Sequence, residues 1–192
     1  MKILLHICCA PCSIVPMRTL REEGHEVAGF FFNPNIHPSL EYRRRLETLQ
    51  EYAHSAAFDL RVSEGYPMEE FLRGVAFREQ DRCSYCYHLR LGETARTAAE
   101  SGFDAFTSTL LYSKYQNHDL IRTIAESLAV QYGTAFCYRD FRDGWKEGIR
   151  LSKQMGMYRQ PYCGCIYSEK ERYLGAAASA GKAFASQKDK RA

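Results

Sequence analysis

Residues 1–13 read MKILLHICCAPCS, an apolar run that ends in three closely spaced cysteines and a proline. The run Lys2–Cys8 contains β-branched residues and has the length and composition of a buried strand. Pro11 and Ser13 follow at once and predict a helix over Ile14–Glu23 that is closed by Gly24. A buried strand that leads directly into a helix is how an α/β domain with a parallel sheet begins.

Strand-like and helix-like segments alternate along the rest of the chain. Further strands are predicted at Val27–Phe32, Leu60–Ser63, Ala105–Leu111 and Ala135–Tyr138. Helices are predicted at residues 39–56, 67–76, 85–101, 119–132 and 146–155. This alternation indicates a mostly parallel sheet flanked by helices, a Rossmann-like architecture similar to that of PP-loop ATPases. In such sheets the functional site lies at the carboxyl ends of the strands, so we expect a metal site there.

No repeat and no Gly- or Ser-rich linker divides the chain. We therefore expect a single α/β catalytic domain over residues 1–180 and a basic tail over residues 181–192, after a fraying helix that begins beyond Gly175. Lys and Arg number 26 against 23 Asp and Glu, a mild excess that permits an anionic partner without indicating one.

The first apolar run is too short for a membrane span, and His6 and the cysteines interrupt it where a signal peptide would continue. No other stretch approaches the roughly 20 apolar residues that a transmembrane helix needs. We expect a cytoplasmic protein without a membrane partner. In that compartment thiols stay reduced, and groups of cysteines usually bind metals or take part in catalysis.

Seven of the eight cysteines fall into three groups with short internal spacings. The groups are Cys8-Cys9-x-x-Cys12, Cys83-x-x-Cys86 and Cys163-x-Cys165. A C-x-x-C turn presents two sulfurs to one ion or cluster, and iron–sulfur clusters usually take four thiolates. Four of the seven would complete a cluster, and three would remain for an ion with the vacant position that catalysis needs. Cys137 stands alone inside a predicted strand, and we interpret it as a core residue.

Three other interpretations of the cysteines stay open on spacing alone. Cys9-Ala10-Pro11-Cys12 has the spacing of a thioredoxin-type dithiol, which would leave five clustered cysteines unused. Four cysteines could hold a structural zinc ion, with three thiols left over. Disulfides would require an oxidising compartment.

Five segments spread over nearly the whole chain together resemble the QueH-type epoxyqueuosine reductases. They are LLHICCAPCS (4–13), FFFNPNIHPSLEYRRR (30–45), DRCSYCYHLRL (81–91), FTSTLL (106–111) and FRDGWKEGIRLSKQMGMYRQPYCGCIYS (141–168). The resemblance implies reduction of the epoxide of epoxyqueuosine at the wobble position of tRNA, without cobalamin and with electrons from an external donor. It also implies a [4Fe-4S] cluster next to a mononuclear iron or zinc ion. Some members have Asp where this chain has Cys12, and both side chains can bind either metal.

The resemblance leads to a prediction for each cysteine. We expect Cys9, Cys83, Cys86 and Cys163 to hold the cluster, and Cys8, Cys12 and Cys165 to hold the single ion. Neighbouring residues of a strand point to opposite sides, which suits separate roles for Cys8 and Cys9. The vacant position of the ion would take the epoxide oxygen while the cluster supplies electrons.

A tRNA substrate also requires basic and aromatic side chains. The candidates for phosphate contact are Arg43, Arg44, Arg45, Lys114, Arg142, Lys146 and Arg159, with Tyr112 and Tyr115 interleaved. The candidate proton donors beside cysteines, for each of which packing is the simpler role, are Tyr85, Tyr87, His88 and Tyr162. His6 lies in a buried strand, and we interpret it as a hydrogen-bonded core histidine.

Three competing functions are kept open. One is a zinc-stabilised nucleic-acid-binding module without redox catalysis, and another is a small-molecule reductase. The third is an ATP-using tRNA-modifying enzyme of similar architecture. Such enzymes carry a Gly- and Ser-rich phosphate loop after the first strand, and this chain has CCAPCS there, which argues against nucleotide hydrolysis.

Overall fold

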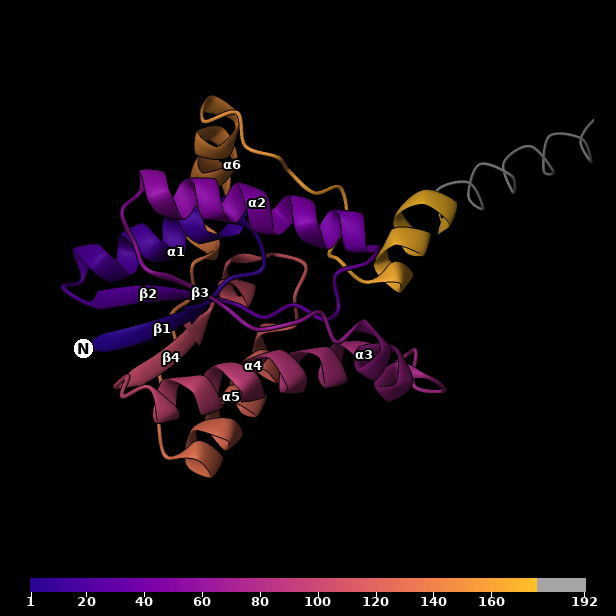
Figure 1. Ribbon diagram of the computed structural model, residues 1–192, viewed down its shortest axis with the longest axis horizontal. Coiled ribbons are helices and arrows are strands. Elements are labelled where there is room, and N and C mark those ends of the chain that lie inside the picture. Colours follow the sequence, from indigo (N-terminus) through magenta and orange to yellow (C-terminus); the bar gives the residue numbers. More distant parts are fainter. Residues whose placement is uncertain (176–192) are drawn as a thin grey trace, which may run out of the picture.

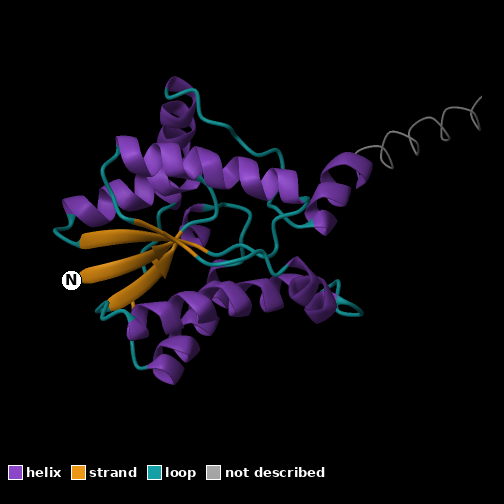
Figure 2. Cartoon of the chain, viewed as in Figure 1, coloured by secondary structure: helices purple, strands orange, loops and turns teal. Residues whose placement is uncertain are grey.

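The apolar run near the start of the chain forms the central strand of a parallel sheet. In the computed structural model, which describes residues 1–175, β1 (Lys2–His6) pairs with β2 (Glu26–Phe31) on one side and β4 (Ala105–Ser108) on the other. β3 (Leu60–Val62) and β5 (Ala135–Phe136) complete the order β3-β2-β1-β4-β5, with all pairings parallel. The side chains of β1 from Ile3 to His6 are buried because helices cover both faces of the sheet (Figures 1 and 2).

Two layers of helices enclose this sheet. One layer contains α1 (Ala10–Glu22), α2 (Ser39–Ser55) and α6 (Trp145–Gln154). The other contains α4 (Arg82–Glu100) and α5 (His118–Tyr132), with α3 (Met68–Val75) packed against α4 (Figure 1). Two short 3-10 helices, η1 (Thr109–Tyr112) and η2 (Arg142–Gly144), follow β4 and precede α6, and another helix begins at residue 166. The predicted α/β fold is confirmed.

The strand order reverses at the centre of the sheet. From β1 the chain adds β2 and then β3 on one side, and it returns to place β4 and β5 on the other. In open parallel sheets, ligands bind in the crevice beyond the carboxyl ends of the two strands that flank this reversal. Here those strands are β1 and β4, and the first cysteine group follows β1 directly.

Several predicted boundaries were wrong in ways that matter for the cysteines. β1 ends at His6, and α1 begins at Ala10 because its first turn accommodates Pro11. Cys12 is therefore helical. α4 begins at Arg82 instead of Tyr85, so the second cysteine pair lies in its first two turns.

The last two predicted strands are shorter than expected. The fourth ends at Ser108, whose hydroxyl accepts a hydrogen bond from the amide of Leu110 and so caps η1. The fifth ends at Phe136, and Cys137 follows it, packed against the core as expected. The predicted tail, the fraying helix and the end of the predicted domain lie outside the described residues. Of the helices in residues 1–175, none combines the length and apolar character of a membrane span.

Candidate metal centre

The first cysteine group surrounds the junction between β1 and α1. The sulfur atoms of Cys8, Cys9 and Cys12 lie within 4.8 Å of one another. Cys9 is the N-cap residue of α1, with extended backbone, and Cys12 lies in the first turn. The sulfurs of Cys9 and Cys12 are 2.7 Å apart, and those of Cys8 and Cys9 are 3.8 Å apart. Three sulfurs this close together could bind one metal ion.

The environment of this group favours a thiolate at Cys8. The adjoining thiols of Cys12 and Cys9 hold the pKa of Cys8 well below its usual value. Burial raises the pKa of Cys9, and proximity to Cys8 raises that of Cys12. The hydroxyl of Thr109, the first residue of η1, lies 3.4 Å from the Cys8 sulfur and can donate to it. Free amides at the start of α1 add to this preference for negative charge.

The other four clustered cysteines come from α4 and from residues 155–165, which we call the cysteine loop. Cys83 and Cys86 lie at the start of α4, and Cys163 and Cys165 lie at the end of the loop. Burial raises the pKa of Cys86 to about 12, and both loop cysteines are close enough to add to this increase. Burial also raises the pKa of Cys83 and of Cys163; Cys165 adds to both increases, and Cys8 adds to that of Cys163. These mutual effects indicate that the groups neighbour one another.

A cavity of about 690 Å³ opens beside the cysteines, at the carboxyl ends of β1 and β4. Cys8, Cys12 and Cys163 contribute to its wall. The rest of the wall is largely aromatic and polar and includes Tyr112, Tyr115, Gln116, Trp145, Arg159 and Gln160. The amide of Gln160 also donates to the sulfur of Cys9, at 2.9 Å. The cavity lies where the strand order predicts a site.

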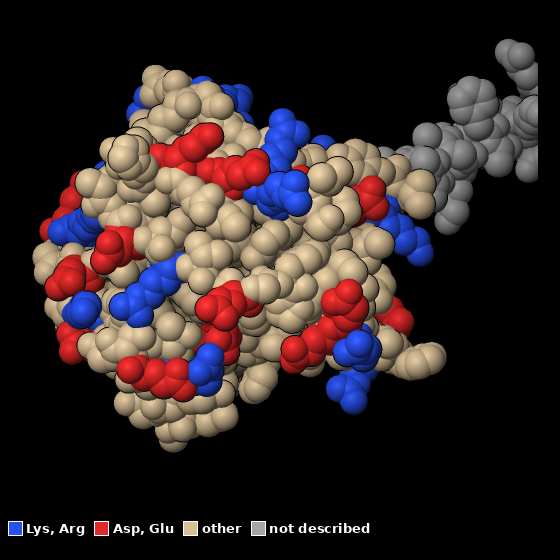
Figure 3. All heavy atoms as spheres, viewed as in Figure 1, with Lys and Arg blue, Asp and Glu red and all other residues tan. Residues whose placement is uncertain are grey.

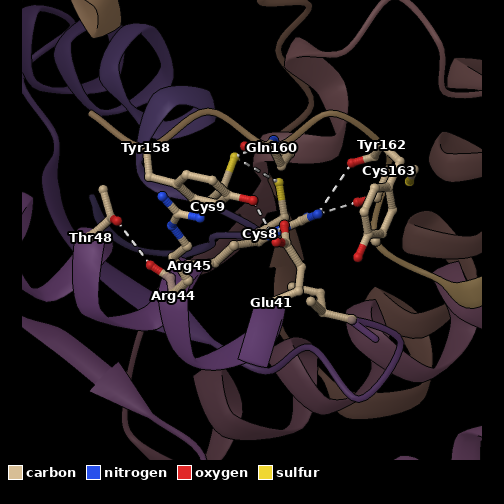
Figure 4. A network of polar contacts seen from close by, with 12 residues as sticks. Cys8, Cys9, Glu41, Arg44, Arg45, Thr48, Tyr158, Gln160, Tyr162 and Cys163 are labelled. Carbon is tan, nitrogen blue, oxygen red and sulfur yellow. Dashed lines mark hydrogen bonds and ion pairs between the residues drawn. The ribbon is translucent and has the colours of Figure 1, made fainter. Parts of the chain in front are cut away.

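Arg45 connects the cysteine loop to α2 through hydrogen bonds and an ion pair. Its side chain is buried and forms an ion pair with Glu41, at 2.7 Å. The same guanidinium donates to the carbonyl oxygens of Cys163 (2.8 Å) and Tyr162 (3.2 Å), as Figure 4 shows. The hydroxyl of Tyr158 donates to the other carboxylate oxygen of Glu41. This corrects the prediction that Arg45 contacts RNA, because a buried and fully engaged guanidinium is not available to phosphate.

A second set of contacts fixes the turn between Cys163 and Cys165. The amide of His37 donates to the carbonyl of Gly164, at 2.8 Å, and the hydroxyl of Tyr162 donates to the carbonyl of His37. Gly164 has a φ of +151°, which strongly favours glycine. A Cβ there would also lie 3.2–3.4 Å from side-chain atoms of neighbouring residues that include Arg45. The spacing C-G-C thus has a structural reason that the sequence alone did not reveal.

The candidate proton donors are engaged in packing or hydrogen bonds. Tyr85 packs against Phe71 and fills the space beside Gly74, and Tyr87 is buried with its hydroxyl donating to Gln116. His88 is exposed. Of the four candidates only Tyr162 lines the cavity, and its hydroxyl is bonded to His37.

His6 is a buried, hydrogen-bonded core histidine, as expected. Its Nδ1 lies 2.9 Å from the hydroxyl of Ser108, and its Nε2 lies 3.2 Å from the carbonyl oxygen of Phe32 and 3.3 Å from Nε of Arg90. Burial lowers the pKa of His6 to about 3, so the ring is neutral. Arg90 itself is a fully buried cation beside Cys86, which the sequence reading did not single out.

Comparison with known proteins shows the family to which the chain belongs. Residues 3–171 match the model of the family described as epoxyqueuosine reductase QueH. The chain belongs to the QueH family. The epoxyqueuosine reductase QueH of Dehalococcoides mccartyi is 38% identical over 172 residues, which cover 90% of this chain and 94% of that protein. The QueH of Thermotoga maritima is 36% identical over 180 residues, covering 88% and 91%. The chain is thus an oxidoreductase of the epoxyqueuosine reductase class.

A solved structure with a similar fold comes from Methanocaldococcus jannaschii and is described as a predicted subunit of a tRNA methyltransferase. It superimposes with a TM-score of 0.56 over 80% of this chain and 74% of its own, at 13% sequence identity. At that identity the likeness shows only the shared fold.

Proposed function

We propose that the chain reduces epoxyqueuosine in tRNA to queuosine at a metal centre held by its seven clustered cysteines. The observation that carries the proposal is that cysteines of the first and third groups line one cavity at the switch point of a QueH-family sheet, and that Arg90 in the same wall contacts Cys86 of the second group. Loss of the epoxide oxygen as water consumes two electrons and two protons. The cysteines are the chain's means of holding a group that supplies such electrons.

The donor chemistry of the site fits the proposed cofactors. Three sulfurs within 4.8 Å suit a soft or borderline metal ion, and four further cysteines match the number of thiolates in a usual cluster. When bound, a [4Fe-4S] cluster beside an iron or zinc ion would supply single electrons from an external donor and a Lewis acid for the epoxide oxygen. The cavity beside Cys8 and Cys12 would hold the modified base and limit its contact with water.

Two divisions of the cysteines between cluster and ion are open to test. The division expected from the sequence assigns Cys9 to the cluster and Cys165 to the single ion. That division relied on Cys8 and Cys9 pointing to opposite sides of a strand. This reason does not apply, because β1 ends at His6, before both cysteines. The short distances among Cys8, Cys9 and Cys12 favour a second division, in which Cys9 joins the ion and Cys165 joins the cluster.

The remaining basic candidates are exposed and suit a tRNA-binding surface. Lys114, Arg142 and Lys146 line a second hollow of about 530 Å³, and Trp145 belongs to the walls of both hollows. Asp140 pairs with Arg142, whereas the two lysines have no ion pair within the described part of the chain. Asp143 also lines this hollow, so the two lysines leave it with a net positive charge next to the cavity.

Other side chains extend this surface. Arg159 lines the cavity itself, and Arg43 and Arg44 are exposed on α2, with Arg44 over the ring of Tyr158. Tyr115 is 85% exposed and stands edge-on to Trp145, which suits stacking with an unpaired base. On the face drawn in Figure 3, acidic and basic side chains are interspersed, so that face offers no continuous basic surface.

Removing both lysines of the second hollow should weaken tRNA binding, because it removes contacts with phosphates, whose contribution to the affinity depends on salt concentration. For the double variant Lys114→Gln with Lys146→Gln, the slope of log affinity against log salt should fall by about 0.7–0.9 per lost phosphate contact. Fluorescence anisotropy with an anticodon stem-loop measures this slope. The matched control is Arg73→Gln with Lys153→Gln, two exposed cations that line neither hollow. Equal changes in both variants would contradict a defined phosphate site.

The reaction itself is tested by anaerobic incubation of reconstituted protein with epoxyqueuosine-containing tRNA and a reductant, with nucleosides read by mass spectrometry. Conversion to queuosine is expected. A colourless protein with stoichiometric zinc and no turnover would instead identify a zinc-stabilised binding module. An intact cluster with no conversion would overturn the substrate assignment.

A further inference from the structure

Arg90 is a buried cation without a carboxylate partner. Arg90 is only 2% exposed, and within residues 1–175 no Asp or Glu forms an ion pair with it. Its guanidinium donates to three neutral or sulfur acceptors: Oδ1 of Asn33 (2.9 Å), Nε2 of His6 (3.3 Å) and Sγ of Cys86 (3.6 Å). An isolated charge is costly to bury, so this position calls for a counter-charge.

The negative charge available to Arg90 comes from the cysteines. The sulfur of Cys86 lies 3.6 Å from its guanidinium, and Arg90 lines the cavity together with Cys8 and Cys163. These three residues come one from each cysteine group, so a single guanidinium lies beside members of all three.

We propose that Arg90 is the fixed counter-charge of an anionic metal–thiolate centre, held in place by its contacts with His6 and Asn33. This inference rests on the proposed metal centre and adds a role for a residue that binds no metal. Thiolate-bound clusters carry net negative charge, and reduction adds one more electron. A buried positive charge nearby therefore stabilises the reduced form and raises the reduction potential. In the metal-free protein the same charge has less negative charge beside it, and its burial costs the fold stability.

The test is Arg90→Met, which removes the charge and keeps much of the volume. Thermal unfolding is measured on metal-free and reconstituted protein, and the reduction potential is measured by EPR-monitored titration. The metal-free variant should unfold at the same or a higher temperature than the wild type. The increase in Tm caused by metal should be smaller, and the potential should be lower. Arg90→Lys should preserve most of the potential.

Asn33→Asp provides a second test that leaves Arg90 in place. It puts a carboxylate at hydrogen-bond distance from the guanidinium and should neutralise it, with the same shift to lower potential. Arg96→Met is the matched control, because Arg96 lies on the same helix with a partly exposed side chain and pairs with Glu93 and Glu100. Because solvent screens the charge of Arg96, the reduction potential of the cluster in the Arg96→Met variant should equal that of the wild type.

The possible outcomes separate this inference from the proposed function. If the wild type assembles no cluster, the proposed metal centre fails. If a cluster assembles but the Arg90→Met and Asn33→Asp variants keep its potential, the counter-charge role is wrong. Equal decreases in Tm for the metal-free and reconstituted forms of Arg90→Met would indicate a purely structural arginine.

Discussion

An Arg45→Ala variant is expected to lose most of its capacity to assemble the metal centre. The guanidinium joins Glu41 on α2 to the carbonyls of Tyr162 and Cys163, so its removal releases the cysteine loop. It also leaves Glu41 as a nearly buried carboxylate without its cation. Breaking a buried ion pair by removing one partner typically costs about 3–5 kcal/mol. That is a large part of the stability of an ordinary domain, about 5–15 kcal/mol.

The adjacent arginine is the matched control for this experiment. Arg44 is exposed, and its guanidinium lies over the ring of Tyr158, 3.9 Å from the centroid. Arg44→Ala should therefore cost no more than about 1 kcal/mol. Urea unfolding gives the stability of each variant, and iron and sulfide analysis after anaerobic reconstitution gives the loading. Wild-type loading in Arg45→Ala would show that the loop is positioned by other contacts.

The positions of the three arginines around helix α2 distinguish Arg45 from Arg43 and Arg44 already in the sequence. Tyr42 and Leu49 lie on the apolar side of α2, and Arg45 is three residues after the first and four before the second. It therefore shares their face, whereas Arg43 and Arg44 point to solvent. Reading the triplet by charge alone hides this difference. The sequence spacing does not reveal the partner of Arg45, because the cysteine loop is more than 100 residues away in the chain.

The fold was more predictable than the geometry of the site. Alternating buried strands and amphipathic helices dictate a parallel sheet, and its carboxyl edge follows from the direction of the strands. The geometry of the site depends on the exact residues at which strands and helices end, and local sequence patterns locate these ends poorly. A strand extended to Cys8 puts two neighbouring sulfurs on opposite sides, whereas the observed end at His6 brings them within 3.8 Å.

Arg90 illustrates a signal that was present but unused. It follows Cys86 by four residues on α4, so both side chains lie on one face of the helix. A cysteine and an arginine at that spacing indicate a charged pair only if the face is buried. That burial depends on β1 and the loop after β2, which supply His6 and Asn33 from distant parts of the chain.

Cysteine variants should separate the two metal sites, and Cys12 gives the clearest expected result. Both divisions assign Cys12 to the single ion. Cys12→Ala should therefore abolish turnover, below about one thousandth of the wild-type rate if the ion supplies several kcal/mol of charge stabilisation. Most of the cluster absorbance should persist. Nucleoside mass spectrometry and visible spectra of the same reconstituted sample measure the two quantities.

Cys9 and Cys165 then decide between the divisions, because each changes sites when the assignment changes. If the sequence-based division holds, Cys9→Ala loses the cluster and Cys165→Ala keeps it. If the proximity of Cys8, Cys9 and Cys12 governs the assignment, the results reverse. Cys137→Ala is the control, since that thiol lies past β5 and its pKa responds to burial, Glu23 and Arg139 instead of to other cysteines. Loss of the cluster in Cys12→Ala, or full turnover without Cys12, would contradict a centre made of two separable parts.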